Sequence, residues 1–339
     1  MEITGKLFSH QTNELLTEEA LSNDNEWRLL RRLHLPDVFN EESSKNLKRG
    51  LFVDVETTGL SHQDDEIIEL AMLPFDYDSE SCEIHQVYNQ QAFSKLREPS
   101  RPIPEHITQI NGITNEMVQG HKIEAEEVEE IVKECVFIIA HNAGFDRPML
   151  EKLFKCFEDK AWSCSVNGVN WKNEGFPSAK LEAIGNHYGW FFDQHRGLAD
   201  CEAGVAVLAQ KLPLSGQRVL ESVRNHAMKN YSLIRAIDFP RDKIQLFKTR
   251  RYRWRPFNLP NGGCWWISTE SPEEELKWLE ETSMNPRSQF YCTEIPPKKN
   301  TQTVIGNSAG QFQKKSKNSQ LGIPASNVGL NLLDQFKKI

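Results

Sequence analysis

The segment from Leu51 to Gly59 places two carboxylates at the end of a short apolar run, and it constrains the fold more than any other feature. It reads Leu-Phe-Val-Asp-Val-Glu-Thr-Thr-Gly, so one residue separates Asp54 from Glu56. Alternate residues of a β-strand point to one face, which predicts that both carboxylates project together from a buried strand. Neighbouring anions are costly to bury unless a cation neutralises them. Oxygen ligands of this kind suit Mg²⁺ or Mn²⁺; the alternative is a strand end with exposed acids.

Composition places the chain among globular proteins and excludes several other classes. Its 339 residues are 38% hydrophobic and 26% charged, a length that fits one medium domain plus a smaller module. No stretch is long and apolar enough to cross a bilayer, and the first residues lack the pattern of a secretory signal. Seven cysteines without C-x-x-C spacing indicate reduced thiols, so we expect a cytoplasmic protein rather than a disulfide scaffold or zinc ribbon.

The net charge of −8 is distributed unevenly along the chain. Residues 297–339 hold seven lysines against the single acid Asp334. From Pro296 onward Asn, Gln, Ser, Gly and Lys dominate, which predicts a disordered basic tail over residues 296–339. A metal-dependent phosphodiesterase needs acids for its ions and bases for its substrate, so the negative net charge does not exclude nucleic acid as a partner.

The spacing of apolar residues predicts an α/β fold behind an N-terminal extension. Residues 10–34 have the pattern of amphipathic helices, and a polar linker follows, so we expect an N-terminal helical extension and linker over residues 1–48. Strands are expected over residues 50–56, 66–75, 82–89 and 136–140, and helices over residues 114–118, 124–135, 145–157, 178–188 and 200–211. This order predicts a mixed central sheet flanked by helices over residues 49–215.

Two further segments place acids at element boundaries of the same domain. Asp146 follows an apolar strand in the first turn of a helix, where ligands gather in open α/β sheets; the alternative is an acid favoured by the helix dipole. Asp200 is suited to N-cap a helix, and His195 lies in the preceding loop, where an ordinary surface histidine is the alternative. Four carboxylates on one rim can hold two divalent ions for phosphodiester cleavage, and a histidine suits the general base.

Three segments resemble the exonuclease motifs of the DEDDh family. They are residues 52–59, 141–146 and 195–200, and their order and spacing fit over about residues 48–212. Residues 111–118 resemble a further segment of the epsilon-like branch, the group of the proofreading subunit of bacterial DNA polymerase III. The resemblance implies a ribonuclease-H-like fold and 3′→5′ removal of nucleoside 5′-monophosphates with two Mg²⁺ or Mn²⁺ ions.

The resemblance also implies a role for each acidic residue. Asp54, Glu56 and Asp200 would ligate the ion that holds the attacking water. Asp54 would bridge to the second ion, which Asp146 would reach largely through water. These four residues are therefore both the expected metal ligands and, together with His195, the expected catalytic residues.

His195 would be the base, because a related group carries tyrosine at the position that Arg196 occupies here. Gly197 departs from the pattern, since many relatives carry alanine there, but no catalytic group is lost. Three residues at the end of the first motif and directly after it are expected to line the 3′-terminal nucleotide, with a plain tight turn as the alternative: Thr57, Thr58 and Leu60.

A small α+β module is expected within residues 216–295. The Asn-Gly-Gly sequence predicts a β-hairpin that joins residues 252–254 to residues 265–267. A helix rich in glutamate is expected over residues 273–281, after Pro272.

Cations and aromatic residues alternate within this module. Residues 241–255 carry seven cations: Arg241, Lys243, Lys248, Arg250, Arg251, Arg253 and Arg255. Arginines with exposed aromatics would bind single-stranded nucleic acid by charge and stacking. The alternative is that Trp254, Trp265 and Trp266 form the core of the module while the arginines are solvated.

These patterns together favour a metal-dependent 3′→5′ exonuclease that acts on single-stranded or frayed DNA ends in proofreading or repair. The same chemistry on RNA ends is the nearest alternative, since no motif reads the 2′-hydroxyl. A nucleic-acid-binding adaptor that has lost catalysis is disfavoured, because all five catalytic residues are present. The apolar residues 330–336 near the C-terminus are a candidate motif for a polymerase or a sliding clamp, and no membrane partner is expected.

Overall fold

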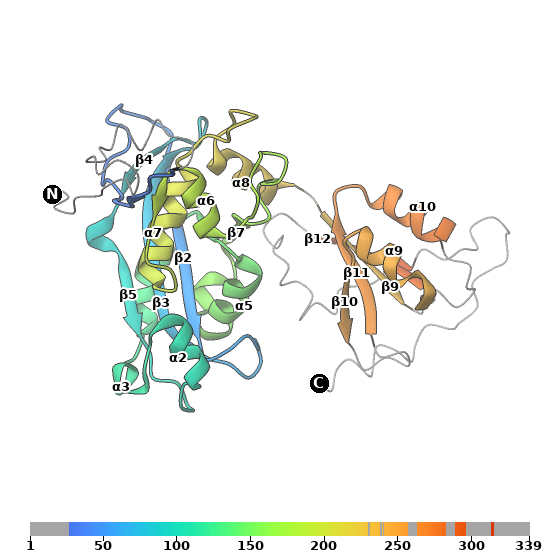
Figure 1. Ribbon diagram of the computed structural model, residues 1–339, viewed down its shortest axis with the longest axis horizontal. Coiled ribbons are helices and arrows are strands. Elements are labelled where there is room, and N and C mark those ends of the chain that lie inside the picture. Colours follow the sequence, from blue (N-terminus) through green and yellow to red (C-terminus); the bar gives the residue numbers. More distant parts are fainter. Residues whose placement is uncertain are drawn as a thin grey trace, which may run out of the picture. The chain divides into compact units, whose positions relative to one another are not determined.

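The computed structural model describes residues 27–229, 231–237, 239, 241–256, 263–282, 289–295 and 313–314. Contacts divide the chain into two compact units (Figure 1). One comprises Met1–Glu158 and Cys164–Val223, and the other comprises Asp159–Ser163 and Arg224–Ile339. The expected disordered tail and the expected helices before residue 27 lie outside the described residues, apart from residues 313–314. The domain boundaries expected from the sequence stay a prediction.

A six-stranded mixed sheet organises the chain up to residue 164, in the order β4-β3-β2-β6-β7 with β5 also paired to β3. Its strands are β2 (Leu47–Thr57), β3 (Ile67–Asp78), β4 (Ile84–Val87), β5 (Phe93–Leu96), β6 (Phe137–Ala140) and β7 (Ala161–Cys164). β2 runs antiparallel to β3 and parallel to β6, which confirms the mixed sheet expected from the sequence. The central position of β2 explains its apolar run, because Leu51, Phe52 and Val53 are fully buried there.

Helices flank this sheet and bring the later motifs toward β2 (Figure 1). They are α2 (Glu105–Asn111), α3 (Asn115–Val118), α4 (Ala125–Glu134), α5 (Ala143–Leu153), α6 (Leu181–His187) and α7 (Gly197–Leu208). Helix α7 packs on β2 and β3. Gly204 makes this close approach possible, because an added Cβ would lie 2.1 Å from Cζ of Phe52. No helix within the described ranges has the length and apolarity that crossing a membrane requires.

Two expectations for this region are wrong. Residues 27–34 are not helical, since β1 (Arg31–Arg32) pairs in parallel with β8 (Trp190–Phe191). Arg32 also forms an ion pair of 2.8 Å with Asp193 and lies over the ring of Phe191. Local periodicity cannot reveal a pairing between segments so far apart in the chain. Helix α7 begins at Gly197 rather than at Asp200, so the second expectation misplaced a helix start by one turn.

The second unit contains a five-stranded antiparallel sheet in the order β10-β11-β9-β12-β13. Its strands are β9 (Tyr231–Ile237), β10 (Arg253–Pro256), β11 (Gly263–Thr269), β12 (Gln289–Ile295) and β13 (Gln313–Lys314). The expected hairpin is present, with Trp254 opposite Trp265, and the expected acidic helix is α10 (Pro272–Thr282). The sequence did not predict β9, β12 or α9 (Ile244–Thr249).

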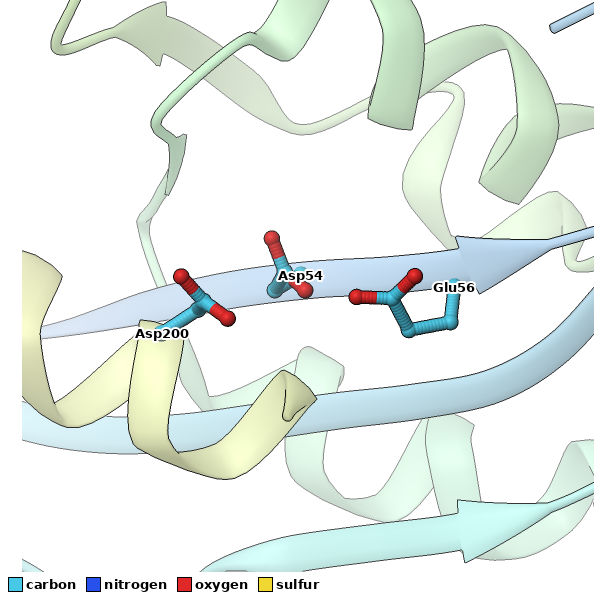
Figure 2. Close-up of side chains that lie close together, drawn as sticks. All are labelled: Asp54, Glu56 and Asp200. Atoms are coloured by element: carbon cyan, nitrogen blue, oxygen red, sulfur yellow. The ribbon is translucent and has the colours of Figure 1, made fainter. Parts of the chain in front are cut away.

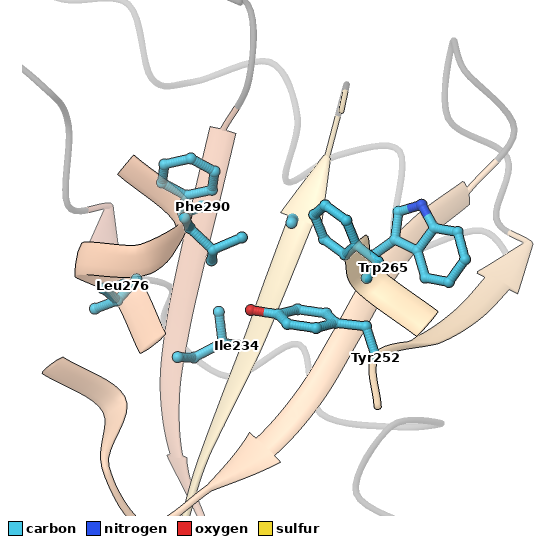
Figure 3. Close-up of a cluster of buried hydrophobic side chains, with 8 residues drawn as sticks. Ile234, Tyr252, Trp265, Leu276 and Phe290 are labelled. Carbon is cyan, nitrogen blue, oxygen red and sulfur yellow. The ribbon is translucent and has the colours of Figure 1, made fainter. Parts of the chain in front are cut away.

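An aromatic core holds the second unit together (Figure 3). Phe247 is fully buried, and its ring lies 4.7 Å from that of Tyr252 and 5.4 Å from that of Trp265. Leu276 and Leu279 of α10 complete the cluster from the helix side. Helices α9 and α10 therefore pack their apolar residues on one face of the sheet, while α8 (Val219–Met228) spans the division between the two units.

Candidate active site

The two carboxylates of β2 lie on one face of the central sheet. Asp54 stands opposite Ala71 of the neighbouring strand β3, and Glu56 stands opposite Glu69. Both carboxylates are partly buried. Because β2 is central and its apolar neighbours are buried, the strand holds the two groups rigidly at a fixed separation.

Asp200 joins this pair from helix α7. One carboxylate oxygen from each of Asp54, Glu56 and Asp200 lies within 4.8 Å of the other two. The three side chains point toward one another (Figure 2). An all-oxygen donor set of this size fits a hard divalent cation such as Mg²⁺ or Mn²⁺.

Asp146 approaches the same place from the start of α5, just after β6. Its side chain is 4% exposed, and its Oδ1 accepts a hydrogen bond of 3.3 Å from the amide of Val55. Burial raises the pKa of Asp146 to about 7, and the charges of Glu56 and Asp200 add to this rise. Asp146 lies outside the group of three oxygens that approach within 4.8 Å, so it borders that group rather than completing it.

The pKa values of the other three carboxyl groups are raised as well. Burial raises the pKa of Asp54 well above its usual value, and the charges of Asp146 and Asp200 raise it further. Burial also raises the pKa of Glu56, and it raises that of Asp200 to about 6. Four carboxyl groups whose pKa values all rise in one place repel one another, and a divalent cation among them would relieve that repulsion.

His195 lies at the entry to α7, beside this cluster. It is exposed, and its φ of 58° is in the left-handed region that non-glycine residues seldom adopt. Its charge opposes the rise in the pKa of Asp200 that burial causes, which indicates that the imidazole lies close to that carboxylate. The amide of Arg196 donates a hydrogen bond of 3.1 Å to Oδ2 of Asp200. Asp200 is therefore not the N-cap but an acid of the first turn that reaches back to the helix entry.

Two buried polar residues beside the carboxylates were not predicted as site residues. Asn111 donates a hydrogen bond of 3.2 Å from Nδ2 to Oε2 of Glu56, and its own Oδ1 accepts from the amide of Ile113. Glu69 is 8% exposed and accepts a hydrogen bond of 2.9 Å from the hydroxyl of Ser94. Asn111 belongs to residues 111–118, which resemble a segment of the epsilon-like branch. Glu69 carries no such signal in the sequence, and only its register opposite Glu56 places it beside the site.

The residues expected to line the terminal nucleotide differ from one another in exposure. Thr57 and Thr58 are buried, while Leu60 is 84% exposed. The hydroxyl of Thr57 donates to the carbonyl of Gly59 at 2.6 Å, and that of Thr58 donates to Oδ1 of Asp65 at 3.0 Å. Both hydroxyls therefore stabilise the turn itself, and Leu60 is the side chain of the three that faces solvent.

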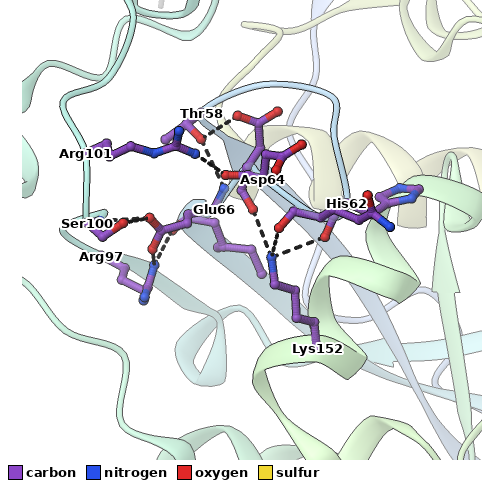
Figure 4. Close-up of polar contacts among 11 residues, drawn as sticks. Thr58, His62, Asp64, Glu66, Arg97, Ser100, Arg101 and Lys152 are labelled. Carbon is purple, nitrogen blue, oxygen red and sulfur yellow. Dashed lines mark hydrogen bonds and ion pairs between the residues drawn. The ribbon is translucent and has the colours of Figure 1, made fainter. Parts of the chain in front are cut away.

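The loop that follows β2 is fixed from two sides (Figure 4). Lys152 of α5 donates from Nζ to the carbonyls of His62, Gln63 and Asp65 at 3.2, 3.0 and 3.4 Å. Arg101 donates to the carbonyl of Asp64. The loop that carries Leu60 is thus fixed close to the carboxylates of β2.

Residues 51–208 match the exonuclease family that is named for RNase T. The chain is similar to the PolC-type DNA polymerase III of Mycoplasma genitalium, at 33% identity over 182 residues, which are 50% of this chain and 12% of that protein. The corresponding protein of Staphylococcus epidermidis is 29% identical over 208 residues, or 56% of this chain and 13% of that protein. The chain thus spans only about an eighth of the length of these relatives.

Two solved structures are also similar to the chain. Exonuclease X in complex with 5′-overhanging duplex DNA is 24% identical, with a TM-score of 0.38 over 51% of this chain and 99% of that chain. Escherichia coli exonuclease I in complex with a dA16 oligonucleotide is 19% identical, with a TM-score of 0.40 over 55% of this chain and 48% of that chain. The segment that matches the exonuclease family, residues 51–208, contains all three motifs and supports their resemblance to the DEDDh exonucleases.

Proposed function

We propose that the chain is a metal-dependent exonuclease that removes nucleoside 5′-monophosphates from the 3′ ends of single-stranded or frayed DNA. The observation that carries this proposal is the convergence of Asp54, Glu56 and Asp200, with one oxygen of each within 4.8 Å of the others. Buried Asp146 borders the group and adds a fourth carboxylate. Such a cluster is unfavourable in a folded protein without a cation, which supports a site built to bind one.

The acidic residues and His195 have different roles in the proposed hydrolysis. When bound, two Mg²⁺ or Mn²⁺ ions would supply an activated water and stabilise the leaving 3′ oxygen. Asp54, Glu56 and Asp200 would hold the first ion, and Asp54 would share the second with Asp146. His195 would take a proton from the attacking water at a ring nitrogen, and its exposure lets it release that proton to solvent.

Leu60 and the backbone of the turn after β2 would contact the 3′-terminal nucleotide. Leu60 is exposed on a loop that Lys152 and Arg101 hold in place, so the contact surface is formed before substrate binds. Thr57 and Thr58 would act through the shape of this turn, because their hydroxyls are engaged within it. A preformed surface lowers the entropy cost of binding a flexible strand.

DNA is favoured as substrate, and proofreading or repair as the setting, because the sequence relatives are named as DNA polymerases III. Hydrolysis of RNA ends is the second candidate, since the residues of the site include no feature that reads a 2′-hydroxyl. Association with a polymerase or clamp through residues 330–336 stays a prediction, as does a cytoplasmic location. Failure of a peptide of residues 325–339 to capture any replication protein would count against that association.

The activity is tested with oligomers of DNA and RNA that carry a label at either end. A 3′ label should appear at once as a labelled mononucleotide, while a 5′ label should give a ladder that shortens stepwise. Both signals should require Mg²⁺ or Mn²⁺ and disappear with EDTA. Release of mononucleotides from the 5′ end, or activity that survives EDTA, would contradict the mechanism.

Matched substitutions connect this activity to the site. Glu56→Gln should lower hydrolysis about 100-fold or more, because it removes one charged metal ligand while preserving shape. Glu129→Gln is the control, because it makes the same chemical change at an exposed residue of α4 that is not part of the site. Equal activity of the two variants would refute the assigned role of Glu56.

A further inference from the structure

The arginine-rich segment of the second unit is divided between structural and exposed side chains. Arg250 is structural, because its Nε donates to Oε1 of Glu275 at 2.8 Å and its guanidinium lies 4.6 Å above the ring of Trp278. Tyr252 is also structural, at 4% exposure within the aromatic core. Neither residue is therefore available as a primary contact for a ligand.

Trp254 behaves differently from its neighbours. It lies on β10, the edge strand of the sheet, and its side chain is 47% exposed. Its ring meets that of the paired residue Trp265 edge-on at 5.4 Å, which fixes its orientation. A large aromatic ring that is oriented by the core, yet half exposed, is the arrangement on which a nucleic acid base can stack.

Two cations accompany this tryptophan. Lys248 lies in the last turn of α9, and Arg251 occupies the turn before β10. Both are exposed, and neither forms an ion pair with the described part of the chain. Arg251 has a φ of 66° at the end of α9, where its amide donates to the carbonyl of Lys248 at 3.0 Å and the next amide, of Tyr252, donates to the carbonyl of Phe247 at 2.9 Å. These hydrogen bonds fix the backbone from which the Arg251 side chain extends.

The distribution of charge in the second unit indicates what kind of ligand it binds. Residues 241–255 contain seven cations and the single acid Asp242, whereas α10 contains five glutamates and the single cation Lys277. Residues 241–255 therefore attract a polyanion, whereas the glutamates of α10 do not. We propose that Lys248, Arg251 and Trp254 of the second unit form a binding surface for single-stranded nucleic acid. Single strands fit because a duplex keeps its base faces stacked inside.

Binding to a closed circle of single-stranded DNA tests this surface, because a circle offers no 3′ end to the catalytic site. The full-length protein is titrated into fluorescein-labelled circles in EDTA, and anisotropy reports affinity at several salt concentrations. Trp254→Ala should weaken binding about 10-fold, as expected for one lost base–aromatic stack. The double variant Lys248→Ala/Arg251→Ala should reduce the slope of log affinity against log salt by about 1.4.

Lys277→Ala is the matched control, because Lys277 is exposed on the acidic helix α10. It should bind circles as the wild type does. Failure of the wild type to bind circles, or wild-type affinity and salt slope in both surface variants, would overturn the proposal. An equal loss on circular duplex DNA would overturn the stacking role of Trp254. None of these outcomes depends on hydrolysis, so each is distinguishable from a failure of the exonuclease activity.

A second, independent observation concerns Glu69, whose buried carboxylate joins β3 to the start of α7. Its Oε2 accepts a hydrogen bond of 3.4 Å from the amide of Gly197, the first residue of α7. Its Oε1 accepts from the hydroxyl of Ser94 on β5. Gly197 must lack a side chain here, since an added Cβ would lie 2.9 Å from Cβ of Ala71 and 3.4 Å from Cδ of Glu69.

Glu69 is 8% exposed and stands opposite Glu56 in the register of β3 against β2. A buried carboxylate is costly unless hydrogen bonds compensate it, and Glu69 accepts such bonds from Gly197 and Ser94. What Glu69 contributes is a fixed position for the segment from His195 to Asp200, which supplies one metal ligand and the expected base. We infer that Glu69 is a positioning residue for that segment.

Two substitutions separate positioning from a role of the charge itself. Glutamine can still accept from Gly197 and donate to Ser94, whereas leucine can do neither. In EDTA, hydrogen exchange of residues 194–200 should rise about 10-fold in Glu69→Leu and stay at the wild-type rate in Glu69→Gln. Only the kinetic expectation depends on the exonuclease activity proposed above: kcat should fall about 10- to 100-fold in the leucine variant and be restored within a few-fold by glutamine. Wild-type exchange in Glu69→Leu, or loss of kcat in Glu69→Gln, would overturn the positioning role.

Discussion

Replacing Asp146 by asparagine is expected to stabilise the metal-free protein at neutral pH while it abolishes hydrolysis. Asparagine keeps the shape of the side chain, and its Oδ1 can still accept the hydrogen bond from the amide of Val55. What it removes is a carboxyl group that is 4% exposed and borders the group formed by Asp54, Glu56 and Asp200. The variant therefore separates the cost of the buried charge from the packing of the side chain.

The size and direction of the effect follow from the pKa of Asp146, which rises from 3.8 to about 7. Below pH 3.8 the carboxyl group of Asp146 is protonated in both the folded and the unfolded chain, so its burial has no electrostatic cost. Between the two values the unfolded chain releases a proton that the folded chain keeps, so stability falls as the pH rises. Three pKa units at about 1.4 kcal/mol each set an upper value of about 4 kcal/mol above pH 7. Because Asp54 and Asp200 share the repulsion, we expect a gain of about 2 to 4 kcal/mol at pH 8.

Hydrogen exchange in peptides from β2 and β3 measures this gain, because it reports the unfolding free energy of that sheet alone. The full chain is compared with Asp146→Asn in EDTA from pH 4 to pH 8. Asp159→Asn is the control, since Asp159 is exposed. The difference between wild type and Asp146→Asn should grow with pH and vanish near pH 4. A difference that stays constant across this range would refute the electrostatic reasoning.

Three further substitutions test other contacts. Lys152→Met removes three hydrogen bonds from the loop that carries Leu60, so KM for an oligonucleotide should rise several-fold with little change in kcat. An unchanged KM would contradict the role of this loop in substrate binding. Arg250→Ala leaves Glu275 without its ion pair and should destabilise the second unit by about 2 kcal/mol in urea unfolding, whereas Lys277→Ala should have no effect. Gly204→Ala should cost about 1 to 3 kcal/mol, because its Cβ would meet the ring of Phe52, and a neutral result would show that α7 can shift outward.

Local pattern was sufficient for the elements that carry the motifs. The apolar run of β2 predicted both a buried strand and a common face for Asp54 and Glu56, because strand alternation is a local property. The helix expected over residues 114–118 is likewise present as α3, and its N-cap is Thr114, whose hydroxyl accepts from the amide of Met117. These features depend on residues within one turn or one strand, which a sequence displays directly.

Features that depend on distant pairing were missed or misplaced. Residues 31–32 were expected in a helix, yet they pair with residues 190–191. Glu69 reaches the site through the register of β3 against β2 and through the packing of α7. The start of α7 was placed at Asp200 because an acid before an apolar run resembles an N-cap, but the helix extends one turn further to Gly197, where only a small residue fits against Ala71.

The second unit shows the same division between local and distant information. The Asn-Gly-Gly turn predicted a hairpin, and the hairpin is present. Sequence alone could not decide which tryptophans are core: Trp265 and Trp266 are buried, while Trp254 is half exposed. That difference depends on which strand lies at the edge of the sheet, and strand order is a property of the whole unit.

The central claim is that the carboxylates around Asp54 form a site for divalent cations. Titration of the full-length protein with Mn²⁺, followed by the electron paramagnetic resonance signal of free Mn²⁺, counts the bound ions directly. We predict two ions per chain for the wild type and the loss of at least one in Asp54→Asn, with Glu129→Gln unchanged. Absence of saturable binding in the wild type, or the same count in Asp54→Asn, would contradict the account.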